Sequence, residues 1–258
     1  MTNNITDKDE IKAKIQPRIY SSNKIKLEDA APLKTPFSVH IDVCSYCNFK
    51  CSFCFQADIL GKKDKNFPHG MMSKELFKKT VDELHDFPEK IKKIKIGNHG
   101  EPTMHKDLPF LIDYARKSGV ADIVEVFTNG SKLNPELNKQ LVDSGLQRIN
   151  ISLEGLSEDR YLKVAKAKIN WDNFVANITD LYEYSRKKGD LVIYIKIVNN
   201  ASELNGKTVF SLTDNEKNLF YKTFGNIADE VYIEKIVPQW AETQKDKQND
   251  LEYTGMYD

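Results

Sequence analysis

Residues 44–54 read Cys44-Ser-Tyr-Cys47-Asn-Phe-Lys-Cys51-Ser-Phe-Cys54 and contain all four cysteines of the chain. Thiolates at this density predict a soft metal ion or an iron–sulfur cluster, because carbonyl and carboxylate oxygens cannot replace sulfur as the ligand. Cys47, Cys51 and Cys54 follow the spacing C-x3-C-x2-C. Three thiolates on a four-iron cube leave one iron without a protein ligand, and that iron can hold a substrate or cofactor.

Two other kinds of metal centre are also to be considered for these cysteines. A structural zinc site normally uses two cysteine or histidine pairs separated by about a dozen residues or more. Here the pairs Cys44/Cys47 and Cys51/Cys54 stand only three residues apart. A ferredoxin-type cluster uses C-x2-C-x2-C with a remote fourth cysteine, which is a different order. The alternative hypothesis is therefore a non-catalytic electron-transfer or zinc-binding protein that uses all four cysteines.

A strand precedes the cysteines, and strand and helix patterns then alternate along the chain. Helix starts are expected at Ser73, Asp107, Asn134-Pro135 and the capping box Thr213-Asp-Asn-Glu216. Alternating or β-branched segments predict strands at residues 37–43, 92–97, 122–127, 147–153, 191–198 and 231–237. Six strands separated by helices predict parallel β/α units with right-handed crossovers. The pattern alone leaves open a doubly wound sheet and a complete or partial barrel.

Unusual polar segments follow the carboxyl ends of the predicted strands. The cysteines follow the first strand, and the others are residues 97–103, 128–130, 152–155 and 199–200. In β/α barrels the chemistry gathers in the loops at this end of the strands. We therefore expect these segments to share one site.

Composition bounds the protein class. The chain has 258 residues, 40% of them hydrophobic, which is enough for one large α/β domain. Its formal charge is zero, which disfavours a nucleic-acid partner, and no apolar run reaches the roughly 18 residues needed to cross a bilayer. The polar start, MTNNITDKDE, is unlike a signal peptide. We expect a cytoplasmic protein with no membrane partner.

The cysteine triad, with the aromatic residue Phe53 before its last member, resembles the signature of the radical S-adenosylmethionine (radical SAM) superfamily. The resemblance implies a partial (β/α)6 TIM-type barrel of parallel strands over residues 37–237. Residues 1–36 are then a lead-in with one short helix, and residues 238–258 a tail or the start of a truncated extension. The chain is similar to the SPASM/twitch-type members but has no cysteine after Cys54 for an auxiliary cluster.

A second motif, Gly100-Glu101-Pro102, resembles the GGE motif of this superfamily, with His99 in place of the first glycine. The resemblance implies that Gly100 and Glu101 bind the amino group of the methionine part of S-adenosylmethionine. A carboxylate near an ammonium group gives a charge-assisted hydrogen bond, which suits this role. The alternative is a plain turn with a solvated glutamate, and the roles of His99 and Cys44 stay open.

Four further residues are candidates for cofactor binding. The resemblance implies that Ser152 and Glu154 contact the ribose and methionine parts, and their spacing places both side chains on one face of the strand. Aspartate is more frequent in the family where Glu154 stands. Phe53 is expected to pack on adenine, with ordinary core packing as the alternative. Asn129 is a further cofactor candidate, or a turn residue that tolerates a left-handed conformation.

The resemblance implies the function as well. A four-iron four-sulfur cluster held by Cys47, Cys51 and Cys54 would reductively cleave S-adenosylmethionine at its open iron. The resulting 5′-deoxyadenosyl radical would abstract hydrogen from a small-molecule substrate, sugar-like or aminoglycoside-like, or from a peptide. An electron donor such as flavodoxin or ferredoxin is the implied partner. The short amino-terminal segment favours a small molecule.

Overall fold

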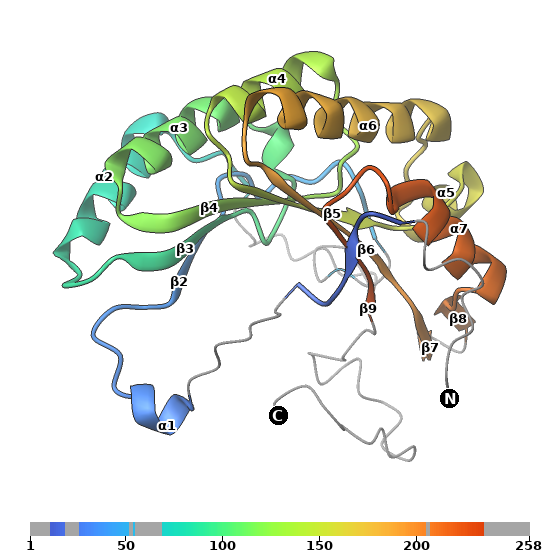
Figure 1. Ribbon diagram of the computed structural model, residues 1–258, viewed down its shortest axis with the longest axis horizontal. Coiled ribbons are helices and arrows are strands. Elements are labelled where there is room, and N and C mark those ends of the chain that lie inside the picture. Colours follow the sequence, from blue (N-terminus) through green and yellow to red (C-terminus); the bar gives the residue numbers. More distant parts are fainter. Residues whose placement is uncertain (1–10, 19–25, 52–53, 55–68, 205–206, 235–258) are drawn as a thin grey trace.

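One parallel sheet of seven strands organises the protein, shown by a computed structural model that describes residues 11–18, 26–51, 54, 69–204 and 207–234 (Figure 1). The strand order is β1-β9-β6-β5-β4-β3-β2, and each neighbouring pair is parallel. The strands are β1 (Lys14–Ile15), β2 (Ser38–Ile41), β3 (Ile91–Ile96), β4 (Ala121–Thr128), β5 (Arg148–Leu153), β6 (Val192–Val198) and β9 (Glu230–Glu234). The sheet is open, with β2 and β1 at its edges, so the predicted partial barrel is confirmed.

The helices follow the strands as the sequence predicts. They are α1 (Leu27–Ala30), α2 (Lys74–Glu83), α3 (Leu108–Ser118), α4 (Pro135–Asp143), α5 (Glu158–Val164), α6 (Trp171–Lys188) and α7 (Asp214–Phe224). Ser73, Asn134 and Thr213 cap their helices through side-chain oxygens. Asp107 differs from the prediction, because it precedes α3 without a side-chain capping bond and pairs with Lys74 at 2.8 Å instead.

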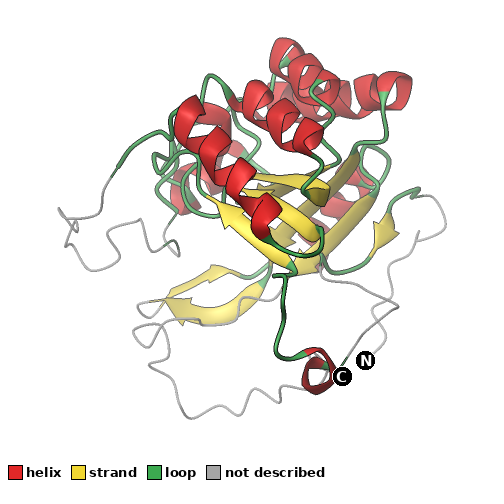
Figure 2. Ribbon diagram, turned by 90° about the vertical axis from the view of Figure 1, so that its left-hand side faces the viewer, coloured by secondary structure: helices red, strands yellow, loops and turns green. Residues whose placement is uncertain are grey.

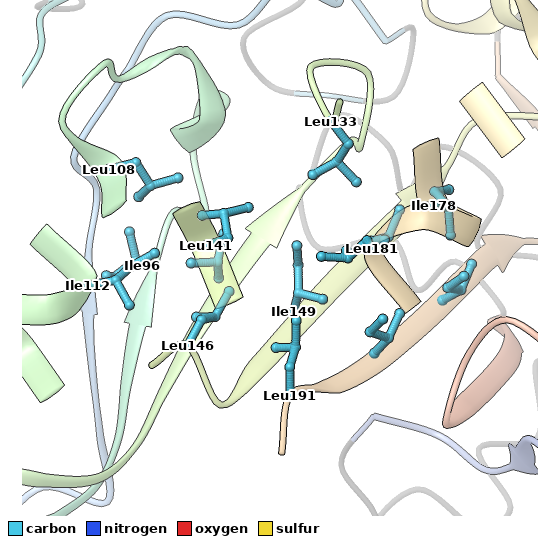
Figure 3. Close-up of a cluster of buried hydrophobic side chains, with 14 of the residues drawn as sticks. Ile96, Leu108, Ile112, Leu133, Leu141, Leu146, Ile149, Ile178, Leu181 and Leu191 are labelled. Atoms are coloured by element: carbon cyan, nitrogen blue, oxygen red, sulfur yellow. The ribbon is translucent and has the colours of Figure 1, made fainter. Parts of the chain in front are cut away.

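The hydrophobic core lies between the sheet and the helices that cover one of its faces (Figures 1 and 3). Ile96 and Ile149 of the strands and Leu108, Leu141 and Leu181 of the helices are fully buried there. Alternate strand residues point to the opposite side of a sheet. The helix-free face consequently carries a different set of side chains, namely Lys93, Lys95, Glu125, Phe127, Arg148, Asn150, Tyr194 and Lys196.

The lead-in before residue 37 adds to the sheet, which the sequence pattern does not predict. The Lys14 N–H donates to Asp229 O at 2.9 Å and the Gln16 N–H to Val231 O at 3.3 Å, so β1 extends the β9 edge. After β1 the side chain of Arg18 reaches the helix-free face, where its guanidinium carbon lies 5.1 Å from the centroid of the Phe127 ring in β4. A strand of two residues is too short to show an alternating hydrophobic pattern in the sequence. β1 forms because the edge of β9 offers it hydrogen-bonding partners.

A second, small sheet is also absent from the prediction. It is the antiparallel pair β7 (Asn200–Leu204) and β8 (Lys207–Phe210), inserted between β6 and α7. Figure 2 shows this hairpin projecting from the main sheet. Among the described residues, none of the helices combines the length and apolar character that a bilayer-spanning helix needs.

Candidate functional site

The cysteine segment begins where β2 ends and is anchored by Cys44. This side chain is 1% exposed, and its Sγ lies 3.5 Å from the carbonyl oxygen of Tyr46. Its backbone forms an isolated bridge to Met71. Cys44 is thereby part of the core, whereas Cys47, Cys51 and Cys54 are only partly buried.

The sulfurs of Cys47, Cys51 and Cys54 lie close enough to influence one another. Burial, with nearby Glu101 and Cys54, raises the pKa of the Cys47 thiol to about 11. Burial also raises the pKa of Cys51 strongly, with Glu154, Cys54 and Cys47 adding to the effect. Buried thiols of this kind are neutral near pH 7 and become thiolates when a metal replaces their protons.

The three thiols fit an iron–sulfur cluster chemically. In a four-iron cube each cysteine binds a different iron, so the sulfurs need not converge on one point. Within the described ranges, no group of three or more His, Cys, Asp or Glu side chains is arranged to surround a single metal ion. The separated but interacting cysteine sulfurs are compatible with the cluster.

Gly100 brings the second motif against the cysteine segment. Its φ is +76°, and a Cβ at this position would overlap the carbonyl oxygen of Cys44 and lie 2.9 Å from that of Tyr46. The next residue, Glu101, donates its N–H to Tyr46 O at 2.8 Å. Only glycine permits both this conformation and this close approach.

The Glu101 carboxylate joins two loops at the carboxyl edge of the sheet. It is 1% exposed, and its Oε1 accepts from the Thr103 N–H at 3.0 Å, from the Thr103 hydroxyl at 2.5 Å and from the Thr128 hydroxyl at 2.6 Å. Its Oε2 accepts from the Asn129 N–H at 2.7 Å. Burial raises the pKa of Glu101, and these donors oppose that rise. Oε2 keeps acceptor capacity for one more donor.

Asn129 connects this anchored loop to the cysteines. Its side-chain amide donates to Asn48 Oδ1 at 3.0 Å and lies 3.9 Å from Cys47 Sγ, while its Oδ1 accepts from Ser131. The turn after β4 therefore contacts the cysteine segment directly. A turn role alone does not account for these contacts.

Glu154 lies on the other side of the cysteines, next to Cys51. Burial raises the pKa of its carboxyl to about 7, and nearby Lys196 and a hydrogen bond with Cys51 oppose that rise. Ser152 lies two residues earlier in β5, opposite Lys196 of β6 in the sheet register. Phe53 lies outside the described residues.

The structure also supplies residues that the sequence analysis missed. His99 Nδ1 lies 2.7 Å from Asp42 Oδ2, and Asp42 Oδ1 accepts the N–H groups of Asn98 and His99. Asp42 thus holds the loop after β3 against the end of β2. Its place near the end of the predicted strand, two residues before Cys44, was the available signal, but its partner lies 57 residues away.

These features define an α/β protein with a thiol-rich site at the carboxyl edge of an open parallel sheet. The model of the radical SAM superfamily matches residues 41–214 of the chain. The chain belongs to this superfamily, whose cofactors are a four-iron four-sulfur cluster and S-adenosylmethionine. The cofactor prediction made from the cysteine spacing and the resemblance is confirmed.

Three similar proteins illustrate the relationship. A probable GTP 3′,8-cyclase of Methanococcus maripaludis is 35% identical over 128 residues, covering 49% of this chain and 39% of that protein. A tungsten-containing aldehyde ferredoxin oxidoreductase cofactor-modifying protein of Pyrococcus furiosus is 26% identical over 223 residues, covering 85% and 56%. Streptococcus suis SuiB, solved bound to S-adenosylmethionine, shares the fold with a TM-score of 0.57 at 15% identity, covering 87% and 48%. The chain covers less than two thirds of each relative.

Proposed function

We propose that the chain is a radical SAM enzyme that cleaves S-adenosylmethionine reductively and abstracts hydrogen from a small-molecule or peptide substrate. When bound, the cluster and S-adenosylmethionine supply a single electron and a 5′-deoxyadenosyl radical. The observation that carries the proposal is the C-x3-C-x2-C triad at the carboxyl edge of the sheet, beside Gly100, Glu101 and Asn129.

The chain's own residues have distinct tasks in this proposal. Cys47, Cys51 and Cys54 hold the cluster, and Asn129 orients the first of them through the contact at Cys47 Sγ. Glu101 receives the ammonium group of S-adenosylmethionine through the remaining acceptor capacity of Oε2. These assignments rest on the contacts among the loops.

The other wall of the proposed cofactor site is formed by Ser152 and Glu154. Ser152 and Glu154 are assigned to the ribose and the methionine part, and Phe53 to the adenine. Their position in or next to β5 and beside the cysteines supports the assignment of the first two. The site shields a reactive species from water, which favours a placement within the loops of a partial barrel.

The proposal includes a cytoplasmic setting and a soluble electron donor such as flavodoxin or ferredoxin. The proposed organisation of the chain is a lead-in over residues 1–36, a partial barrel over 37–237 and a tail over 238–258.

The direct test is anaerobic reconstitution followed by assay of S-adenosylmethionine cleavage under strong reductant. We expect about four irons per chain and formation of 5′-deoxyadenosine, because three cysteines leave one iron open. A Cys47→Ala variant should lose both iron and product. Zinc in the metal analysis without any 5′-deoxyadenosine would instead support the non-catalytic alternative.

A further inference from the structure

The helix-free face of the sheet carries unpaired positive charge near β2 to β4. Lys93 and Lys95 stand on β3, and Arg18 reaches the same region from the segment after β1. Within the described part of the chain, none of these three forms an ion pair closer than 4.0 Å. Burial lowers the pKa of Lys95, Glu125 opposes this, and Arg18 and Lys93 lower it further, so the three cations influence one another.

A buried carboxylate lies in the same region. Glu125 is 0% exposed, and its Oε1 has no hydrogen-bond partner among the described residues. Its Oε2 is 3.4 Å from the side-chain amide of Asn150 and 3.7 Å from Nε of Arg148. A buried acceptor without a hydrogen bond costs folding free energy. A donor from outside the described structure would remove this cost at Oε1.

The remaining part of this face is electrically balanced. Arg148 forms a two-pronged pair with Glu230 at 2.5 and 3.3 Å, and Lys196 pairs with Glu234 at 2.6 Å. Arg148 therefore has its own carboxylate partner in addition to Glu125. Among the described residues, the cations of this face that have no ion-pair partner are Arg18, Lys93 and Lys95, and the register places Glu125 between Lys95 and Arg148.

We propose that this region binds the anionic end of a small-molecule substrate. Lys93, Lys95 and Arg18 receive a carboxylate or phosphate group, and Glu125 Oε1 accepts a hydrogen bond from a hydroxyl or amine beside that group. The proposal rests on the proposed function and adds the substrate class to it. The substrate is an anionic molecule bearing a hydrogen-bond donor next to its charge.

The site has the correct position for such a substrate. Lys95 lies two residues before Gly97, where the loop toward Gly100 begins, and strand residues rise by about 3.3 Å each. The anionic end would therefore lie about 7 Å below the carboxyl edge of the sheet. The reacting part of the molecule then reaches the edge at which the cysteines are gathered.

Trace acetylation of amines on the reconstituted full chain tests the site without a known substrate. Inorganic phosphate is the first probe and succinate the second, which separates recognition of phosphate from that of carboxylate. We expect one or both probes to slow acetylation of Lys95 severalfold. Lys92 is the matched control, because it is on the same strand but exposed and faces Asp122 at 3.7 Å. No protection of Lys95 by either probe, or equal protection of Lys92, would overturn the proposal.

Variants identify which side chains are responsible for the protection of Lys95 by the anion. Arg18→Gln should weaken the protection of Lys95 severalfold, whereas Lys92→Gln should leave it unchanged. Glu125→Gln removes the negative charge of this carboxylate and keeps the shape, so less phosphate should give the same protection. Unchanged protection in both Arg18→Gln and Glu125→Gln would contradict the assigned charges, provided that thermal melting shows both variants to be folded.

The result of the acetylation test can be distinguished from the result of the test of the proposed function. Amine protection does not require cleavage of S-adenosylmethionine, and 5′-deoxyadenosine can be measured without the substrate. Product formation without protection of Lys95 would remove the anion site and leave the enzyme proposal intact. Protection in a chain that binds no iron would remove the enzyme proposal and leave an anion-binding face.

Discussion

The Glu101 carboxylate has more partners within the protein than a cofactor contact alone would require. Its two oxygens accept hydrogen bonds from the loop after β3 and from the turn after β4, which itself contacts Cys47. The residue is thus proposed both to position the loops and to receive the ammonium group. Two substitutions separate these roles.

Glu101→Gln should lower the free energy of unfolding and the affinity for S-adenosylmethionine. The amide replaces an acceptor with a donor beside groups that already donate, and loss of such a buried bond costs about 1–3 kcal/mol. Thermal unfolding and equilibrium dialysis of S-adenosylmethionine measure the two effects.

Thr128→Val is the matched variant, because it removes one donor to Glu101 and retains the carboxylate. It should reduce stability and leave the affinity nearly unchanged. Exposed Glu75→Gln should change neither. If Thr128→Val weakened binding as much as Glu101→Gln, the direct contact to the ammonium group would be refuted.

Cys44 should be dispensable for the cluster. Its side chain is buried in the core beneath the segment that carries the other three cysteines. Cys44→Ala should keep about four irons per chain, while alanine at Cys47, Cys51 or Cys54 should abolish iron binding. Iron and sulfide analysis after anaerobic reconstitution decides this, and equal loss in all four variants would favour the fully ligated electron-transfer hypothesis.

Sequence reasoning could predict which residues matter at this edge but not how they contact one another. Cysteine spacing identifies a ligand set by itself, because the chemistry depends on residue type and interval. Two of the four donors to Glu101, Thr128 and Asn129, and the partner of His99 come from segments distant in sequence, so only the folded sheet brings them together. The strand pattern likewise does not predict that Oε1 of Glu125 has no hydrogen-bond partner among the described residues.

At the level of elements, the close approach of Gly100 to the cysteine segment makes it a sensitive position. Gly100→Ala would drive a methyl group into the backbone of Cys44 and impose strain at φ +76°. We expect lower stability and reduced iron incorporation, measured by thermal melting and iron analysis.

Gly119 provides the control, since its φ is +72° but nothing lies within 4 Å of an added Cβ. Gly119→Ala should show only the cost of the left-handed backbone, about 1–2 kcal/mol. Iron content should stay normal in this variant. Equal iron loss in both variants would mean that general destabilisation, and not the contact with Cys44, controls cluster assembly.

The elements predicted from the sequence are those with long periodic patterns or explicit caps. All six expected strands occur, and the capping box at Thr213 forms with both of its hydrogen bonds. The strands β1, β7 and β8 were missed. β1 has two residues and depends on a distant edge, and β7 and β8 pair only with each other. Local pattern carries little information about pairings of this kind.

At the scale of the whole molecule, the contact between β1 and β9 should contribute to stability. Lys14→Pro removes the N–H that bonds to Asp229 O and should lower the free energy of unfolding by about 1 kcal/mol or more. Ile15→Pro is the control, because alternate N–H groups of an edge strand point away from its partner. Chemical denaturation compares the two, and an equal loss would show that the β1–β9 bonds are not the cause.

The β1–β9 pair also has a consequence for the order in which the protein is completed during synthesis. β1 leaves the ribosome early, but its partner is made more than two hundred residues later. β6, the other neighbour of β9 in the sheet, is made before β9 and can already pair with β5 while the β1 segment still waits. Chains fold largely from the amino terminus as they emerge. Ordering of β1, and with it the contact of Arg18 with Phe127, therefore has to wait until β9 has been made.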